Sequence, residues 1–325
     1  MKPMVFISRM LPHVALDYVK EKCNVEVNEA DTALPKGELI AKLQGRGGLI
    51  SLLTDTIDEE VFQKCPDLRV VSNVAVGYNN IDVKAATRYR VMVTNTPGVL
   101  DDTTADFTWA LLMATARRVV EADRYVREGK FTEWRLILFL GQDVHHKTLG
   151  IVGLGRIGKA VARRAKGFDM RILYTDVKRA DEATERELGA TFVDKETLLR
   201  ESDFISLHVP LFPETTHYIS QAELNMMKPT AILVNAARGP VVDEKALVKA
   251  LKERQISGAG LDVFEREPLV EPGLLELDNV VLAPHIASAS VETRNRMALM
   301  AAENCVAALT GKRPPNLVNS EVWQQ

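Results

Sequence analysis

Short apolar runs alternate with amphipathic stretches along the first third of the chain. The runs that read as strands cover residues 5–8, 25–28, 48–53, 69–74 and 91–95. Apolar residues at helical spacing lie between them, at 14–22, 37–43 and 58–64. Strands separated by helices predict βαβ units, and therefore a parallel sheet.

A longer helical pattern follows this first block. Asp101 or Asp102 can cap a helix, and residues 105–126 carry apolar positions at helical spacing. Gly129 is a plausible end. We therefore expect one long helix that leads out of the first domain into a second.

The second block repeats the same rhythm. Strands are predicted after a glycine-rich stretch at 148–153, at 171–175, 204–208, 231–235, 258–263 and 280–283, with helices at 156–167, 195–201 and 244–253. A last helix is expected at 290–309. The sequence thus predicts an α/β protein with two doubly wound, Rossmann-like parallel sheets and a cleft between the domains.

Composition and charge narrow the class of protein. The chain has 325 residues, of which 46% are hydrophobic and 26% charged, and a formal net charge of -3. These values are typical of a globular protein with no strong attraction to nucleic acid or anionic membranes. No apolar run approaches the ~18 residues that a membrane span requires. Three widely spaced cysteines offer no disulfide framework, so a cytoplasmic location is expected.

Gly153-Leu154-Gly155-Arg156-Ile157-Gly158 matches the G-x-G-x-x-G pattern of dinucleotide-binding proteins. A lone match is a weak signal, but here an apolar strand precedes it and an amphipathic helix follows. The first glycine permits a tight turn, the second lets the backbone approach a pyrophosphate, and the third lets helix and strand pack closely. The free N–H groups at the start of the helix would then bind the phosphates.

Asp176 ends the next predicted strand, 18 residues after Gly158 (158 to 176). A carboxylate at this place accepts hydrogen bonds from the ribose hydroxyls of NAD and repels the 2′-phosphate of NADP. Lys178 and Arg179 complicate the prediction, because a nearby cation can bind that phosphate. Asp176 could also be a solvated turn residue. We expect NAD, with NADH as reductant, rather than NADP.

Arg238, Glu267 and His285 each follow a predicted strand of the second block. Ligands bind beyond the carboxyl ends of the strands in such sheets. A guanidinium binds a carboxylate, a histidine exchanges the proton of an alcohol, and a carboxylate beside a histidine holds its tautomer and raises its pKa. With a nicotinamide, this set indicates reversible reduction of a 2-keto acid. Singly, the three could be a salt-bridge arginine, a solvated turn acid (as Glu265 is expected to be) and a structural histidine.

Seven motifs together resemble the D-isomer-specific 2-hydroxyacid dehydrogenases, most closely their glyoxylate and hydroxypyruvate reductases. They are V-A-V-G-Y-N-N-I-D at 74–82, T-N-T-P-G-V at 94–99, D-D-T-T-A-D at 101–106, G-L-G-R-I-G at 153–158, N-A-A-R-G-P-V-V-D-E at 235–244, G-L-D-V-F-E-R-E-P at 260–268 and P-H-I-A-S at 284–288. The resemblance covers nearly the whole chain. It implies a flavodoxin-like substrate domain of residues 1–98 plus 288–325, an NAD-binding domain of residues 99–287, and a homodimer formed through the latter.

The resemblance also implies site residues. Arg238 would bind the substrate carboxylate and polarise the keto group, His285 would be the acid/base, and Glu267 its partner. The expected substrate-binding residues are Leu53, Val76, Gly77, Arg238 and His285. The expected cofactor-binding residues are Thr104, Gly153, Gly155, Arg156, Ile157, Gly158, Asp176, His208, Pro210, Ala236, Ala237, Arg238, Asp262, His285 and Ser288.

One departure concerns the cofactor. Archaeal glyoxylate reductases that this chain resembles carry Ser-Arg, suited to NADP, where this chain has Asp176-Val177. Glu267 differs from the Gln of the formate dehydrogenase branch. Two alternatives stay open: a dinucleotide-sensing protein similar to the corepressors of this fold, and a dehydrogenase for another acid such as D-lactate or D-3-phosphoglycerate.

The remaining candidates carry weaker signals. Adjacent His145 and His146 share no face, so no metal site is expected. His13, His208 and His217 have no evident base partner in the sequence, and Cys65 is expected to be a packed residue rather than a nucleophile. Leu52 and Leu53 are expected to end a strand and form a small apolar wall for the substrate. The resemblance implies that residues 131–140 pack on a partner subunit, where Trp134 reaches the neighbouring substrate pocket.

Overall fold

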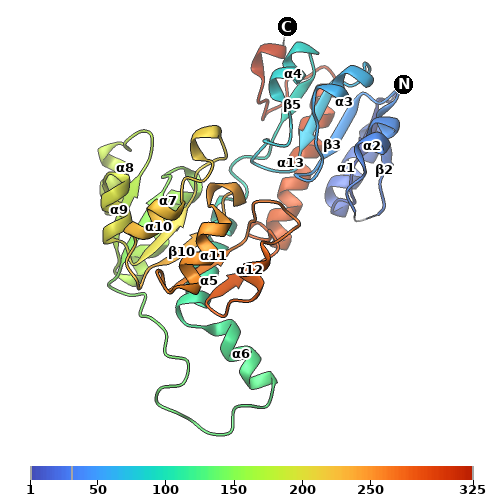
Figure 1. The fold of residues 1–325 in the computed structure, drawn as a ribbon. Coiled ribbons are helices and arrows are strands. Elements are labelled where there is room, and N and C mark those ends of the chain that lie inside the picture. Colours follow the sequence, from blue (N-terminus) through green and yellow to red (C-terminus); the bar gives the residue numbers. More distant parts are fainter. Residues whose placement is uncertain (1, 31, 324–325) are drawn as a thin grey trace. The chain divides into compact units, whose positions relative to one another are not determined.

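The computed structural model describes residues 2–30 and 32–323 (Figure 1). The chain divides into two compact units. Met1–Leu100 and Ala289–Gln325 form unit 1, and Asp101–Ser288 forms unit 2. Each unit is built around its own parallel sheet, as the alternating pattern of the sequence predicts.

Unit 1 contains a five-stranded sheet of order β2-β1-β3-β4-β5, in which all neighbouring strands are parallel. Its strands are β1 (Met4–Ile7), β2 (Asn24–Val27), β3 (Gly48–Ser51), β4 (Val70–Asn73) and β5 (Met92–Thr94). Its helices are α1 (His13–Lys22), α2 (Lys36–Leu43), α3 (Glu59–Lys64), α4 (Val83–Arg88), α13 (Val291–Leu309) and the 3-10 turn η4 (Ser320–Val322). The last helix therefore returns to the first unit.

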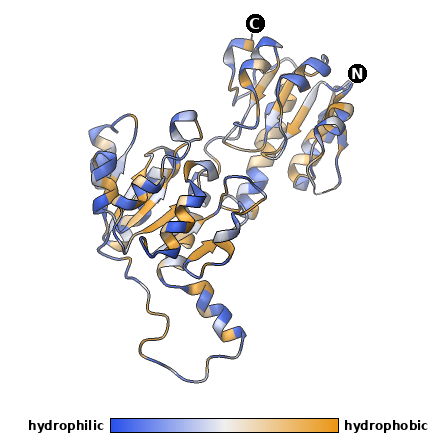
Figure 2. Cartoon of the chain, viewed as in Figure 1, coloured by the Kyte–Doolittle hydropathy of each residue, from blue (hydrophilic) through white to orange (hydrophobic). Residues whose placement is uncertain are grey.

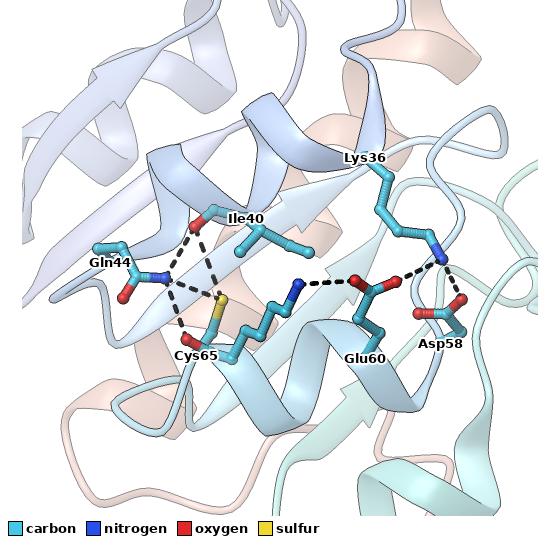
Figure 3. A network of polar contacts seen from close by, with 7 residues as sticks. Lys36, Ile40, Gln44, Asp58, Glu60 and Cys65 are labelled. Atoms are coloured by element: carbon cyan, nitrogen blue, oxygen red, sulfur yellow. Dashed lines mark hydrogen bonds and ion pairs between the residues drawn. The ribbon is translucent and has the colours of Figure 1, made fainter.

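Polar contacts join α2 to α3 across the surface of unit 1 (Figure 3). The Lys36 ammonium group lies 2.5 Å from Asp58 Oδ2 and 3.1 Å from Glu60 Oε2. Gln44 Nε2 lies 3.6 Å from the Cys65 sulfur. Burial raises the pKa of the Cys65 thiol. The contact with Gln44 lowers this pKa, but by less than burial raises it. A buried, protonated thiol at this position packs and is a poor nucleophile.

Unit 2 contains a seven-stranded sheet of order β12-β11-β10-β9-β6-β7-β8, again with parallel neighbours. Its strands are β6 (Thr148–Val152), β7 (Arg171–Thr175), β8 (Ala190–Phe192), β9 (Phe204–Leu207), β10 (Ile232–Asn235), β11 (Gly258–Leu261) and β12 (Val280–Leu282). Its α-helices are α5 (Asp101–Ala116), α6 (Val119–Arg127), α7 (Arg156–Ala165), α8 (Glu182–Leu188), α9 (Lys195–Glu201), α10 (Gln221–Met226), α11 (Glu244–Lys252) and α12 (Pro272–Leu275). Its 3-10 turns are η1 (Lys166–Phe168), η2 (Pro213–Thr215) and η3 (Gly239–Val241).

The strands of unit 2 consist largely of hydrophobic residues (Figure 2), and these are buried on both faces of the sheet. Phe204 packs in a cluster with α5 and α7, whereas its neighbour Ile205 packs in a second cluster with α9, α10 and α11. Ile232 and Leu233 divide between the two faces in the same way. A parallel sheet covered by helices on both faces requires such continuous apolar runs. This is why the strands could be predicted from the sequence.

The predicted single helix over 105–126 is wrong, because the structure has two helices there. Between α5 and α6, Arg118 adopts φ 55°. The carbonyl of Ala116 accepts a hydrogen bond from the Gln142 N–H at 2.8 Å. Gln142, 26 positions further along the chain (116 to 142), thus binds a carbonyl at the end of α5. The continuous apolar pattern of the sequence gives no indication of this contact. Gly129, the predicted end, has φ 71°, a conformation that favours glycine.

All seven strands of unit 2 run in one direction, so their carboxyl ends meet at a single edge. The motifs predicted to bind ligand follow β6, β7, β10, β11 and β12, and they therefore gather at that edge. The centre of the sheet, where β6 lies between β9 and β7, is where the strand order reverses. Such reversal points are where ligands bind in open α/β sheets. Among the described residues, no helix is long and apolar enough to cross a membrane.

Candidate active site

The glycine motif forms the turn between β6 and α7. Gly153 has φ 92°, and a Cβ there would lie 2.9 Å from the carbonyl oxygen of His208. A Cβ on Gly158 would lie 2.1 Å from the carbonyl oxygen of Gly153. At Gly155, in contrast, a Cβ would meet nothing within 4 Å. No side chain caps α7, so open space adjoins free helix N–H groups, and the loop fits a dinucleotide pyrophosphate.

Asp176 follows β7 and lies beside this turn. Its Oδ2 accepts a hydrogen bond from the Leu154 N–H at 2.7 Å. Its Oδ1 makes no hydrogen bond to any described residue, and so remains able to accept one from a ribose hydroxyl. The carboxylate is half-buried. Both features fit the ribose of a dinucleotide.

His208 follows β9, and its backbone closes against the glycine turn. Its Nε2 lies 2.8 Å from Ser206 Oγ. Burial lowers the pKa of His208 to about 4, so the imidazole is neutral at physiological pH. It can therefore form hydrogen bonds without adding a positive charge to the site. Pro210, two residues further on, is exposed.

Arg238 is positioned by the turn after β10. Asn235, which is 1% exposed, accepts a hydrogen bond from the Ala237 N–H at 3.0 Å and donates one to the Arg238 carbonyl at 3.0 Å. Burial lowers the pKa of the Arg238 guanidinium, and the Glu267 carboxylate raises it in part. A largely desolvated guanidinium binds a carboxylate more strongly than an exposed one does.

Glu267 and His285 form a direct pair. Glu267 Oε2 lies 2.8 Å from His285 Nδ1, and Glu267 Oε1 accepts the Phe264 N–H at 3.0 Å. Burial raises the pKa of Glu267, but the His285 contact, the Phe264 N–H and Arg238 lower it. Their combined effect is larger than that of burial, so the pKa of Glu267 lies below its usual value. Because Nδ1 is bound to an ionised carboxylate, Nε2 is the nitrogen left to exchange a proton with a ligand.

Asp262 holds the backbone that carries His285. His285 adopts φ 56°, a left-handed conformation unfavourable for a histidine. The Asp262 carbonyl accepts the His285 N–H at 2.8 Å, and its carboxylate oxygens accept the N–H groups of Ile286 (2.7 Å) and Ala287 (2.8 Å). Burial raises the pKa of Asp262, and these two N–H groups partly offset the rise. The sequence analysis expected Asp262 to bind the cofactor and missed this positioning role.

Gly239 permits the close approach of the Arg238 and Glu267 segments. A Cβ at Gly239 would lie 1.9 Å from the carbonyl carbon of Phe264. The glycine after the arginine is thus required by packing between η3 and the loop after β11. This contact brings the arginine-bearing turn against the segment that carries the glutamate.

Two other predicted cofactor contacts are less informative. Thr104 lies in the first turns of α5 and is 4% exposed. Ser288 is half-buried at the end of unit 2.

In unit 1, Val76 and Gly77 lie in the loop after β4. The Val76 carbonyl accepts a hydrogen bond from Asn95 Nδ2 at 2.8 Å, and the Gly77 carbonyl accepts one from Asn73 Nδ2 at 3.0 Å. Neither N–H group is hydrogen-bonded within the described part of the chain. Leu53 is half-buried. The sequence predicted that Leu53 ends a strand, but β3 ends at Ser51, so Leu53 lies in the turn that follows.

The expectation that Glu265 is a solvated acid and that His217 has no partner is wrong. His217 Nε2 lies 2.5 Å from Glu265 Oε1, and the Glu265 side chain is 23% exposed. The Glu265 N–H also donates to Glu244 Oε1 at 2.9 Å. The pair joins residues 48 positions apart, so no local pattern in the sequence marks it.

Trp134 is 76% exposed, within a stretch whose apolar side chains are mostly exposed. His145 Nε2 lies 3.9 Å from Asp143 Oδ1. Within residues 2–30 and 32–323, no group of three or more His, Cys, Asp or Glu residues could hold a metal ion.

Comparison with known proteins agrees with this geometry. Residues 109–287 match the model of the NAD-binding domain of D-isomer-specific 2-hydroxyacid dehydrogenases. A glyoxylate reductase of Korarchaeum cryptofilum is 59% identical over 324 residues, which cover 99% of this chain and 97% of the relative. A glyoxylate reductase of Thermococcus kodakarensis is 54% identical over 326 residues, with 99% and 98% coverage.

Solved structures give the same result. A protein of Thermus thermophilus matches with a TM-score of 0.92 at 45% identity, over 97% of this chain and 99% of that one. An NADPH-dependent glyoxylate/hydroxypyruvate reductase of Sinorhizobium meliloti, solved with NADP and malonate, matches with a TM-score of 0.90 at 30% identity, over 100% and 99%. Taken with the glycine turn and the His285–Glu267 pair, these matches show that the chain is an oxidoreductase acting on CH–OH groups and belongs to the D-isomer-specific 2-hydroxyacid dehydrogenase family.

Proposed function

We propose that this protein reduces a small 2-keto acid with NADH, glyoxylate to glycolate or hydroxypyruvate to D-glycerate. The observation that carries the proposal is the ionised Glu267 bound to His285 Nδ1 at the strand edge that also bears Arg238. The names of the relatives support glyoxylate as substrate. We propose residues 99–287 as the cofactor domain and residues 1–98 with 288–325 as the substrate domain.

Three side chains would perform the chemistry. Arg238 would bind the substrate carboxylate and polarise the keto oxygen. When bound, the reduced nicotinamide supplies the hydride to the keto carbon. His285 would donate the proton from Nε2 to the keto oxygen, and Glu267 would hold the imidazolium and its tautomer. In the reverse direction His285 would accept that proton.

We propose NAD(H) over NADP(H). The free Oδ1 of Asp176 would accept a ribose hydroxyl, and its charge would repel a 2′-phosphate. The Sinorhizobium meliloti reductase uses NADPH, so relatives at this level of identity do not fix the preference. We assign the pyrophosphate to Gly153, Gly155 and Gly158 with Arg156 and Ile157, and further cofactor contacts to the segments around Thr104, His208, Pro210, Ala236, Ala237, Asp262 and Ser288.

In unit 1 we propose that the N–H groups of Val76 and Gly77 bind the substrate carboxylate. The two peptide planes that carry these donors are held, because the Ala75 carbonyl accepts the Thr96 N–H at 2.8 Å and the Val76 carbonyl accepts Asn95 Nδ2 at 2.8 Å. Leu53 would contact the small substituent of the keto acid.

We propose that the protein is a homodimer. Apolar side chains are exposed on α6 and along residues 131–140, at Val119, Val120, Val126, Phe131, Trp134, Leu136, Ile137 and Leu140. Exposed apolar area of this extent is typical of a surface that another subunit covers. Light scattering should therefore give twice the mass of one chain. The three buried, unpaired cysteines support a cytoplasmic location.

A cofactor and substrate panel tests the function. NADH oxidation is followed at 340 nm with glyoxylate, hydroxypyruvate and pyruvate, and NADPH is measured beside it. We expect turnover with glyoxylate or hydroxypyruvate and a higher kcat/KM with NADH. Preference for pyruvate would indicate a D-lactate dehydrogenase, and tight NADH binding without turnover would indicate a dinucleotide sensor.

A further inference from the structure

The turn after β7 carries two cations, and the structure treats them differently. Arg179, three positions after Asp176, binds Glu185 through two parallel contacts: Nε to Oε1 at 2.9 Å and Nη2 to Oε2 at 2.8 Å. Lys178 is exposed and forms no ion pair with any described residue. Only one of the two cations is therefore held in a fixed geometry.

The side chain of Glu185 is itself held by a hydrogen bond from the buried Tyr174. The Tyr174 hydroxyl, on a side chain that is 0% exposed, donates to Glu185 Oε1 at 2.7 Å. The same hydroxyl accepts the Ala180 N–H at 2.9 Å. The Glu185 side chain is only 12% exposed, against 64% for Arg179. A buried tyrosine thus anchors the carboxylate that binds the arginine.

The two parallel N–H donors of the Arg179 guanidinium are both bound to Glu185. A guanidinium binds a phosphate through the same pair of parallel N–H bonds that it uses for a carboxylate. While Glu185 takes these donors, Arg179 cannot offer them to a ribose 2′-phosphate. The Arg179 contact and then the Tyr174 contact lower the pKa of Glu185, so the carboxylate stays ionised at neutral pH.

We propose that Glu185 is a specificity-determining residue for the cofactor: by binding Arg179 it withholds the cation that would otherwise recognise the 2′-phosphate of NADPH. The proposal rests on the proposed dinucleotide site and deepens its NADH preference. Asp176 would repel the phosphate directly, and Glu185 would occupy the one guanidinium of the turn, which leaves only Lys178, whose ammonium group lacks the paired donors.

Cofactor binding without keto acid tests this separately from turnover. Dissociation constants for NADH and NADPH are measured by fluorescence titration of the unaltered protein, Glu185→Gln, Arg179→Ala and the double variant. Gln at 185 keeps an oxygen that accepts the Tyr174 hydroxyl, and thermal unfolding checks the fold. Glu182→Gln is the matched control, because it removes a carboxylate from the same helix, α8, and leaves the Arg179–Glu185 pair intact.

We expect Glu185→Gln to tighten NADPH binding roughly threefold to tenfold, as for a new charge-assisted contact at an exposed site. NADH binding and the Glu182→Gln control should change little. Arg179→Ala alone should leave both constants unchanged, and in the double variant it should abolish the gain.

Three results would overturn the proposal: unchanged NADPH affinity in a folded Glu185→Gln variant, a gain that persists without Arg179, or weaker NADPH binding in Arg179→Ala alone. Failure to reduce any keto acid would refute only the proposed function, since the titrations contain none.

Discussion

Replacing Glu267 by Gln should change the pH dependence of the reaction more than its maximal rate. The substitution keeps the size of the side chain and an oxygen that can accept the Phe264 N–H, but it removes the charge 2.8 Å from His285 Nδ1. Glu267 has a lowered pKa, so it is ionised throughout the neutral range. The variant therefore removes a negative charge at every pH of the assay.

The size of the effect follows from the contact. A hydrogen bond between charged groups contributes about 1.5–3 kcal/mol when buried. The two side chains are 29% and 36% exposed, so solvent screening reduces this to about 1–2 kcal/mol. Since about 1.4 kcal/mol corresponds to a factor of ten, loss of this contact should lower kcat/KM for reduction by up to roughly tenfold.

The direction of the reaction determines whether the loss of activity grows toward alkaline or toward acidic pH. Keto-acid reduction requires the imidazolium, which the carboxylate stabilises, so the variant loses the competent form as the pH rises. Its kcat/KM should fall about tenfold below that of the unaltered enzyme at the alkaline end and approach it in acid, where the imidazolium forms without help. Initial rates of NADH oxidation from about pH 5.5 to 8.5, around the usual histidine range, measure this. An equal loss at both ends would refute the reasoning, because Glu267 would then act through structure alone.

His285→Ala should lower kcat by roughly 10²–10⁴ and leave the NADH dissociation constant unchanged, since the pyrophosphate site lies at the glycine turn; a parallel loss of NADH affinity would contradict this. Arg238→Ala should raise KM for the keto acid and lower kcat, and Arg238→Lys should recover little because an ammonium lacks the paired donors; full recovery by Lys would exclude bidentate binding. Glu223→Gln should destabilise the fold by about 1–2 kcal/mol at pH 7, after discounting for solvent screening. Burial raises the pKa of Glu223, but Lys195 and Ser220 lower it to about 2. The stabilisation is therefore complete above the ordinary glutamate pKa and lost as the pH falls toward 2, so urea unfolding at pH 7 should separate the variant from the unaltered protein and unfolding near pH 2 should not.

The sequence by itself determined the architecture, because the physics involved is local. Strands covered on both faces need continuous apolar runs, and those at 171–175 and 204–208 match β7 and β9 closely. The sequence also predicted the glycine turn, since Gly153 adopts a φ of 92° and a Cβ on Gly158 would lie only 2.1 Å from the carbonyl oxygen of Gly153.

The tertiary structure decided what depends on contacts between distant residues. His217 meets Glu265 across 48 positions, and Gln142 ends α5 by binding the Ala116 carbonyl. Arg179 shows the same limit over a short separation: the sequence displays a cation near Asp176, but not that Glu185 occupies it. Residue types and periodicity specify which side chains reach the strand edge. Only the folded chain specifies which of their charges and hydrogen-bonding groups remain free to bind a ligand, because their partners lie on other loops.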